Sequence, residues 1–295
     1  MLRAGKKNAE NKVKNVTQYE SGVLVATSSQ GRPFCANYRT GCSLFSHMNH
    51  KDCQVSSKDG MAWQTLVDAQ ATDTLEMLKF ASTPGLSLEK LVKTGVTERA
   101  VVRFGERRFV GKDFIEIIKH CSFKFAVLII GGNDEYLFDG EGEIKEKAKC
   151  FLHNIKSTFD HWSFKVIFIT TILPRGSANP ELDQRRRDVE QRKAEFNIVL
   201  QSLVKSQANF HKTQGGFAAL RVIDMSAVLS DWDKLDRSFF CSQPHRSGDF
   251  IHFNAKVMAQ WVILLKKGLE SVRVPYKKTS GGKLKKSYKK ISAPK

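Results

Sequence analysis

Residues 125–134 read FAVLIIGGND, and this stretch decides the fold class of the chain. Six consecutive apolar residues, 125–130, are typical of a strand that lies inside a parallel sheet and is buried on both faces. The two glycines that follow allow a sharp bend, which brings a polar side chain or a backbone N–H close to a ligand. We therefore expect a buried strand with Asn133 in a binding position just beyond its carboxyl end.

Two further apolar stretches, KVIFITT at 165–171 and LRVID at 220–224, predict buried strands of the same kind. Strands are also expected at 23–26, 75–81 and 99–104, and helices at 87–93, 112–120, 143–161, 181–208 and 254–272. Parallel strands joined by helices need crossover connections, which place helices on the faces of the sheet. The sequence therefore predicts an α/β fold, a three-layer sandwich in which helices flank a central parallel sheet.

Residues that can carry chemistry follow the predicted strands. In open parallel sheets, functional groups gather at the carboxyl ends of the strands. Gly105 follows the strand at 99–104, and Asp249 and His252 stand in GDFIHFN, directly before the last helix. An Asp and a His three positions apart in such a loop can place a general base and its orienting carboxylate in one cleft.

Two of these motifs resemble blocks of the SGNH/GDSL hydrolase superfamily. GGND at 131–134 is similar to its Gly-x-Asn-Asp block, and DFIH at 249–252 to its terminal Asp-x-x-His block. KVIFITTILPRG and LRVIDMSAV stand in the order that the superfamily shows, so the resemblance covers roughly residues 75–272. It implies an SGNH-like (flavodoxin-like) fold and a serine esterase or acyl hydrolase that acts on a small ester or acetyl group and needs no cofactor for catalysis.

The resemblance also implies roles for individual residues. In the superfamily, a Ser after the first strand attacks the ester, a His takes its proton and an Asp orients the His. The oxyanion is bound by the Ser backbone N–H, a Gly after the second strand and the Asn side chain. These roles fall on His252 as base, Asp249 as its orienter, Asn133 as oxyanion donor and Gly105 as the glycine.

The serine block departs from the superfamily pattern, because no Gly-Asp-Ser occurs in the chain. The nearest match by position is Gly85-Leu86-Ser87-Leu88, which makes Ser87 the expected nucleophile. Ser87 could equally be a turn or helix-cap residue. An alternative alignment on Asp59-Gly60 contains no serine, and on that alignment the domain is catalytically inactive.

A segment rich in cysteine and histidine, 31–66, precedes the hydrolase-like region. Cys35, Cys42, His50 and Cys53 form Cys-x6-Cys-x7-His-x2-Cys, with His47 as an alternative ligand. A structural zinc would supply folding energy that this core-poor segment lacks, whereas the alternative is a loop of reduced thiols. The spacing loosely resembles zinc fingers of retroelement and RNA-binding proteins, so a retroelement origin is a further interpretation.

Charge adds a second functional reading. The chain has 295 residues, 41% of them hydrophobic, and carries 48 basic against 30 acidic side chains, a net charge of +18. It can bury a core, which excludes a wholly disordered or collagen-like polypeptide. We expect residues 1–30 to form a flexible basic lead-in, and residues 276–295 hold eight lysines and no acid. Such ends attract RNA or DNA, or they serve solubility or nuclear targeting. An inactive SGNH-like domain that binds nucleic acid is therefore the alternative function.

The location of the protein is predicted from what the sequence lacks. The chain contains neither an apolar run of about 18 residues nor a signal peptide. We therefore expect an intracellular protein, cytoplasmic or nuclear, with no membrane partner. The sequence leaves the oligomeric state open.

Overall fold

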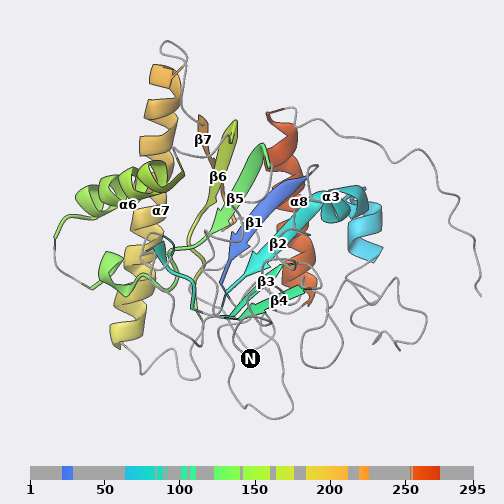
Figure 1. The fold of residues 1–295 in the computed structure, drawn as a ribbon. Coiled ribbons are helices and arrows are strands. Elements are labelled where there is room, and N and C mark those ends of the chain that lie inside the picture. The colour runs from blue at the N-terminus through green and yellow to red at the C-terminus, as the bar shows by residue number, and fades with distance from the viewer. Residues whose placement is uncertain are drawn as a thin grey trace, which may run out of the picture.

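The computed structural model describes residues 22–28, 64–83, 85–88, 91, 101–104, 107–110, 123–139, 142–159, 164–175, 184–211, 219–225, 253 and 255–272. Within this part of the chain, seven strands form one sheet in the order β4-β3-β2-β1-β5-β6-β7 (Figure 1). Their bounds are β1 Val23–Thr27, β2 Leu78–Ser82, β3 Val101–Phe104, β4 Arg107–Val110, β5 Phe125–Ile129, β6 Val166–Thr170 and β7 Ala219–Ile223. Five adjacent strands, β2, β1, β5, β6 and β7, are parallel, and β3 and β4 add an antiparallel edge beside β2.

Helices cover both faces of the sheet. Helices α6 (Ile144–Phe159) and α7 (Gln184–His211) lie on one face, and α3 (Thr72–Met77) and α8 (Ala255–Glu270) lie on the other (Figure 1). A short 3-10 helix, η4 (Glu135–Leu137), follows β5. The predicted three-layer α/β fold with a central parallel sheet is confirmed.

The core consists of two apolar clusters, one on each side of the sheet. Side chains of a strand alternate between its faces. In β1, Leu24 and Ala26 accordingly join the cluster beneath α6 and α7, whereas Val23 and Val25 join the cluster beneath α8. All four residues are fully buried, so β1 lies at the centre of the molecule.

That position of β1 corrects the expected domain boundaries. The sequence suggested a flexible lead-in over 1–30 and a domain that begins at residue 75, but β1 pairs with both β2 and β5. The domain therefore includes residues 22–28. The sequence suggested only a short strand there because its surroundings are polar.

Two expected elements also differ in detail. The first three residues of the strand expected at 75–81 belong to α3, and the strand begins at Leu78. The segment 99–104 was expected in the parallel sheet, but β3 runs antiparallel to β2 and pairs with β4 as an edge hairpin. The remaining predicted strands and the helices at 143–161, 181–208 and 254–272 are confirmed within a few residues. The helix expected at 112–120 lies outside the described residues.

The strand order shows where a ligand can bind. Counted along the chain, the five parallel strands stand in the order 2-1-3-4-5, so the sheet reverses its direction of growth between β1 and β5. In such sheets, ligands bind at the carboxyl ends of the strands beside this reversal point. The ends of β1 and β5 are therefore the place to look for a site.

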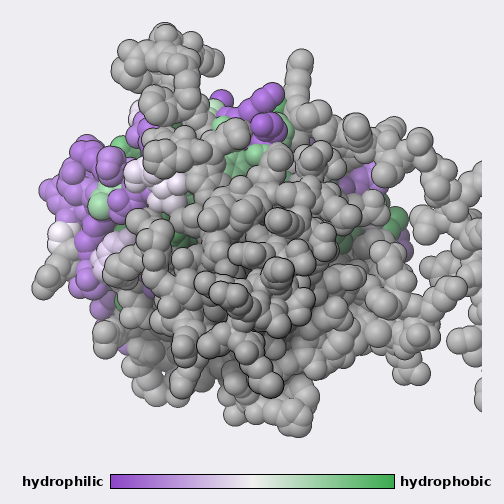
Figure 2. Space-filling view, viewed as in Figure 1, coloured by the Kyte–Doolittle hydropathy of each residue, from purple (hydrophilic) through white to green (hydrophobic). Residues whose placement is uncertain are grey.

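The outer surface of the α6–α7 side is polar. Figure 2 shows mostly hydrophilic residues over these two helices at the left edge of the molecule. Helix α6 buries Ala148, Phe151, Leu152, Ile155 and Phe159 and leaves its charged residues outside, as expected of an amphipathic helix packed on a sheet. In the described part of the chain, no helix combines the length and the apolar character that crossing a membrane would require.

Candidate functional site

A pocket lies at the carboxyl ends of β1, β5 and β6. Its volume is about 40 Å³, and its described lining consists of Ser28, Ile129, Ile130, Gly132, Asn133, Thr170, Thr171, Leu173, Pro174 and Arg175. Ser28 directly follows β1, and Asn133 lies in the turn after β5. The pocket therefore occupies the reversal point that the strand order indicates.

The turn after β5 is shaped by its first glycine. Gly131 has a φ of +100°, a conformation that residues with a Cβ rarely adopt. The turn is closed by a hydrogen bond from the Asp134 N–H to the Gly131 carbonyl (3.1 Å). The bend directs Asn133 toward the pocket and leaves Asp134 buried.

The loops that follow the two neighbours of β1 contact each other. Asn133 Nδ2 donates to the Leu86 carbonyl oxygen (3.0 Å), and the Leu88 N–H donates to both carboxylate oxygens of Asp134 (2.9 and 3.0 Å). Leu86 and Leu88 come after β2, whereas Asn133 and Asp134 come after β5. Because β1 lies between these strands, the two loops flank its carboxyl end.

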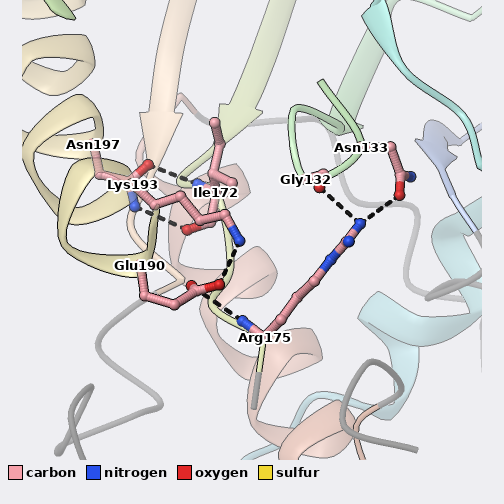
Figure 3. Close-up of polar contacts among 7 residues, drawn as sticks. All are labelled: Gly132, Asn133, Ile172, Arg175, Glu190, Lys193 and Asn197. Atoms are coloured by element: carbon pink, nitrogen blue, oxygen red, sulfur yellow. Dashed lines mark hydrogen bonds and ion pairs between the residues drawn. The ribbon is translucent and has the colours of Figure 1, made fainter. Parts of the chain in front are cut away.

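The segment after β6 brings an arginine to the same pocket. Arg175 Nη2 donates to the Gly132 carbonyl oxygen (2.8 Å) and to Asn133 Oδ1 (2.6 Å), as Figure 3 shows. A guanidinium is a planar, always-charged donor that suits such contacts with oxygen atoms. Arg175 thereby links the end of β6 to the turn after β5.

Side chains of helix α7 form hydrogen bonds with the backbone of the segment after β6. Asn197 accepts from the Ile172 N–H (2.7 Å) and donates to the Ile172 carbonyl (2.8 Å). Glu190 accepts from the Arg175 backbone N–H (3.1 Å) and from Lys193 Nζ (2.7 Å). Figure 3 shows these contacts together, with the three side chains extending from α7 toward the segment.

The predicted residues are placed as follows. Asn133 lies in the pocket lining. Ser87 is only 6% exposed, does not belong to the described lining, and its carbonyl accepts the Leu91 N–H (3.0 Å). Ser87 thus precedes a helical turn. It also follows β2, the second strand of the chain, although a nucleophile was expected after the first.

Several predicted residues fall outside the described part of the chain: Gly105, Asp249, His252, Cys35, Cys42, His50 and Cys53. Phe253, the chain neighbour of His252, is described; it is buried in the cluster beneath α8 and packs on Trp261 with ring centroids 5.6 Å apart. Among the described residues, no group of three or more His, Cys, Asp or Glu side chains could hold a metal ion.

Sequence reasoning assigned no role to three residues of this region, namely Ser28, Gly85 and Arg175. The signal for Ser28 was present, because a strand was expected at 23–26 and a serine pair, Ser28–Ser29, follows it. The absence of Gly-Asp-Ser and the polar surroundings obscured that signal. Gly85 follows β2 and has a φ of +62°. In the chain, β2 is the second strand, whereas Gly105 follows β3.

No protein-family model and no curated protein sequence matches the chain. Solved structures with a similar arrangement include a GDSL-like lipase from Bacteroides thetaiotaomicron, which has a TM-score of 0.45 and 12% identity over 90% of this chain and 97% of that chain. They also include phospholipase A1 from Streptomyces albidoflavus, with a TM-score of 0.39 and 14% identity over 84% of this chain and 99% of that chain.

Proposed function

We propose that the protein is a serine-dependent acyl hydrolase of the SGNH kind that acts on a small ester. The observation that carries this proposal is that Ser28 and Asn133 line one pocket at the reversal point of the sheet. The motif resemblance placed Asn133 there from the sequence. The strand order now supplies a serine after the first strand, where the superfamily pattern needs one.

The serine pair Ser28–Ser29 replaces Ser87 as the source of the nucleophile in this proposal. Ser28 is 8% exposed and its carbonyl accepts the Ser82 hydroxyl (2.7 Å), which ties the end of β1 to β2. Ser29 follows it in the chain and lies outside the described residues. Ser87 is set aside because it follows the wrong strand and precedes a helical turn.

The other roles are those that the motif resemblance implies. The nucleophilic oxygen attacks the ester carbonyl carbon, the alcohol leaves, and water then releases the acid from the acyl-enzyme. Asn133 would donate to the oxyanion, together with the N–H of the nucleophile and an N–H near Gly85 after the second strand. His252 and Asp249 remain the proposed base and orienter, and Phe253 fixes the start of α8 beside them in the chain.

The size of the pocket supports a small acyl group. A volume of about 40 Å³ holds about three or four water molecules, which is the scale of an acetyl group. The lining adds aliphatic surface from Ile129, Ile130 and Leu173. A short acyl chain suits a small pocket of this mixed polar and aliphatic lining.

Hydrolysis of p-nitrophenyl acetate by the full chain and three serine variants tests the proposal. We expect either Ser28→Ala or Ser29→Ala to lower kcat by roughly 10³-fold or more. Ser87→Ala is the control, because Ser87 lies outside the described pocket lining and its hydroxyl has no part in the proposed chemistry. The proposal fails if the wild-type protein does not hydrolyse the ester, or if both Ser28→Ala and Ser29→Ala remain fully active.

A further inference from the structure

We propose that Arg175 is a positioning residue that fixes the Asn133 carboxamide for oxyanion binding, and that α7 holds Arg175 in place through Glu190 and Asn197. The kinetic part of this inference rests on the proposed function. The geometric part concerns the orientation of one side-chain amide, and it can be tested without any substrate.

Two contacts determine which end of the Asn133 amide is oxygen. Arg175 Nη2 can only donate, so the atom 2.6 Å from it must be the acceptor Oδ1. The Leu86 carbonyl can only accept, so the atom 3.0 Å from it must be the donor Nδ2. A flipped amide would place donor against donor and acceptor against acceptor.

This orientation leaves one donor for a ligand. An amide nitrogen carries two hydrogens, and the Leu86 carbonyl uses one of them. Within the described part of the chain, the second N–H of Asn133 makes no protein hydrogen bond, and Asn133 belongs to the pocket lining. A donor whose direction is set before the substrate arrives is what stabilises a developing oxyanion most effectively.

Arg175 can set that direction because both its guanidinium and its backbone are held by hydrogen bonds. Its Nη2 also donates to the Gly132 carbonyl (2.8 Å), so the guanidinium holds the backbone of the turn as well as the amide. Its backbone N–H is held by Glu190, and Asn197 clamps Ile172 three residues earlier. Glu190 and Asn197 are seven residues apart, which is about two helical turns, so they lie on the same face of α7.

The Glu190 carboxylate is itself held by a buried cation. The side chains of Lys193 and Glu190 are 3% and 13% exposed, and their charged atoms are 2.7 Å apart. Lys193 Nζ also lies 5.7 Å from the centre of the Phe138 ring, close to the turn after β5. This buried pair orders the Glu190 carboxylate, which ties the segment that carries Arg175 to α7.

A double-mutant cycle on p-nitrophenyl acetate hydrolysis tests the kinetic part. Arg175→Met is expected to lower kcat roughly 10- to 100-fold with KM nearly unchanged, because a misplaced donor weakens transition-state binding. Asn133→Ala is expected to lower kcat about 10²–10³-fold. If Arg175 acts through Asn133, then Arg175→Met has little further effect in the Asn133→Ala background.

Two more variants distinguish positioning from general structural damage. Arg175→Lys keeps a cationic donor and should retain more turnover than Arg175→Met. Arg187→Met removes another arginine whose guanidinium hydrogen-bonds an exposed residue, Gln184, and should leave kcat unchanged. Fully multiplicative losses in the cycle would overturn the proposal. An increase in KM at constant kcat would also overturn it, because Arg175 would then bind substrate directly.

Nuclear magnetic resonance of protein with isotope-labelled asparagine tests the geometry directly. The Asn133 amide signals, assigned by their loss in Asn133→Ala, should be well dispersed in the wild type. Arg175→Met should shift these signals and reduce the chemical-shift difference between the two amide hydrogens. Arg187→Met should do neither. Unchanged signals in Arg175→Met would overturn the positioning role even in an active enzyme. If the wild type does not hydrolyse the ester but Arg175→Met still changes the Asn133 signals, only the proposed function would be overturned.

Discussion

Gly131 and Gly132 are neighbours in one turn, yet their requirements differ. Gly131 combines a φ of +100° with close packing, because a Cβ there would lie 2.6 Å from Ile172 Cδ1 and 2.8 Å from Ile172 Cγ1. A Cβ on Gly132 would meet nothing within 4 Å. The first glycine is therefore needed by the backbone and the core, and the second is not.

This difference predicts unequal effects of the same substitution. Gly131→Ala should lower the free energy of unfolding by about 2–4 kcal/mol, from backbone strain and overpacking against Ile172. Gly132→Ala should change it by less than about 0.5 kcal/mol. Urea unfolding of both variants and the wild type measures this. Equal effects at the two positions would contradict the described turn.

The two polar residues of the turn have separate tasks. Asn133 lies at the pocket, whereas the Asp134 side chain is buried and binds the Leu88 backbone N–H. The sequence could indicate Asn133 because the GGND motif resembles a block in which the Asn side chain is an oxyanion donor. It could not assign the Asp134 contact, because the partner lies 46 positions away in the chain.

At the scale of elements, α7 supports the pocket through polar side chains directed at the segment after β6. The sequence predicted this helix at 181–208 but gave no indication of which of its polar residues are buried. Lys193 and Asn197 are nevertheless 2% and 4% exposed. The partners of these buried polar residues, Ile172 and Arg175, become evident only from the packing of α7 on the sheet.

The two hydrogen bonds between Asn197 and Ile172 predict that truncating the Asn197 side chain lowers stability strongly. Asn197→Ala leaves a buried N–H and a buried carbonyl of Ile172 without their partner, which should lower the free energy of unfolding by about 2–4 kcal/mol. Ile198 is the adjacent residue on α7 and is 68% exposed. Ile198→Ala should therefore change stability by less than about 0.5 kcal/mol. Thermal or urea unfolding compares the two, and a similar loss in both would contradict the clamp.

At the scale of the whole molecule, the sequence predicted the layers of the fold well and the centre of the sheet poorly. Long apolar runs such as FAVLII identify buried strands directly, and the helices between them require a parallel sheet. Strand order is different, because it depends on which segments pair across long separations. The central place of β1, a five-residue strand in polar surroundings, could not be read from local pattern. The site residue beside it, Ser28, was missed for the same reason.

The central position of β1 predicts that a chain lacking it cannot fold. Without residues 1–74, β2 and β5 would each lose a parallel neighbour along five registered residue pairs, and the fully buried side chains of residues 23–26 would leave both apolar clusters. Two exposed strand edges beside unfilled cores favour aggregation. We therefore expect a fragment of residues 75–295, which contains the domain suggested by the sequence at 75–272, to be aggregated in size-exclusion chromatography and to lack a cooperative thermal transition in circular dichroism. The full chain should be soluble and unfold cooperatively under the same conditions. A monomeric fragment with a cooperative transition would show that β1 is not the centre of the sheet.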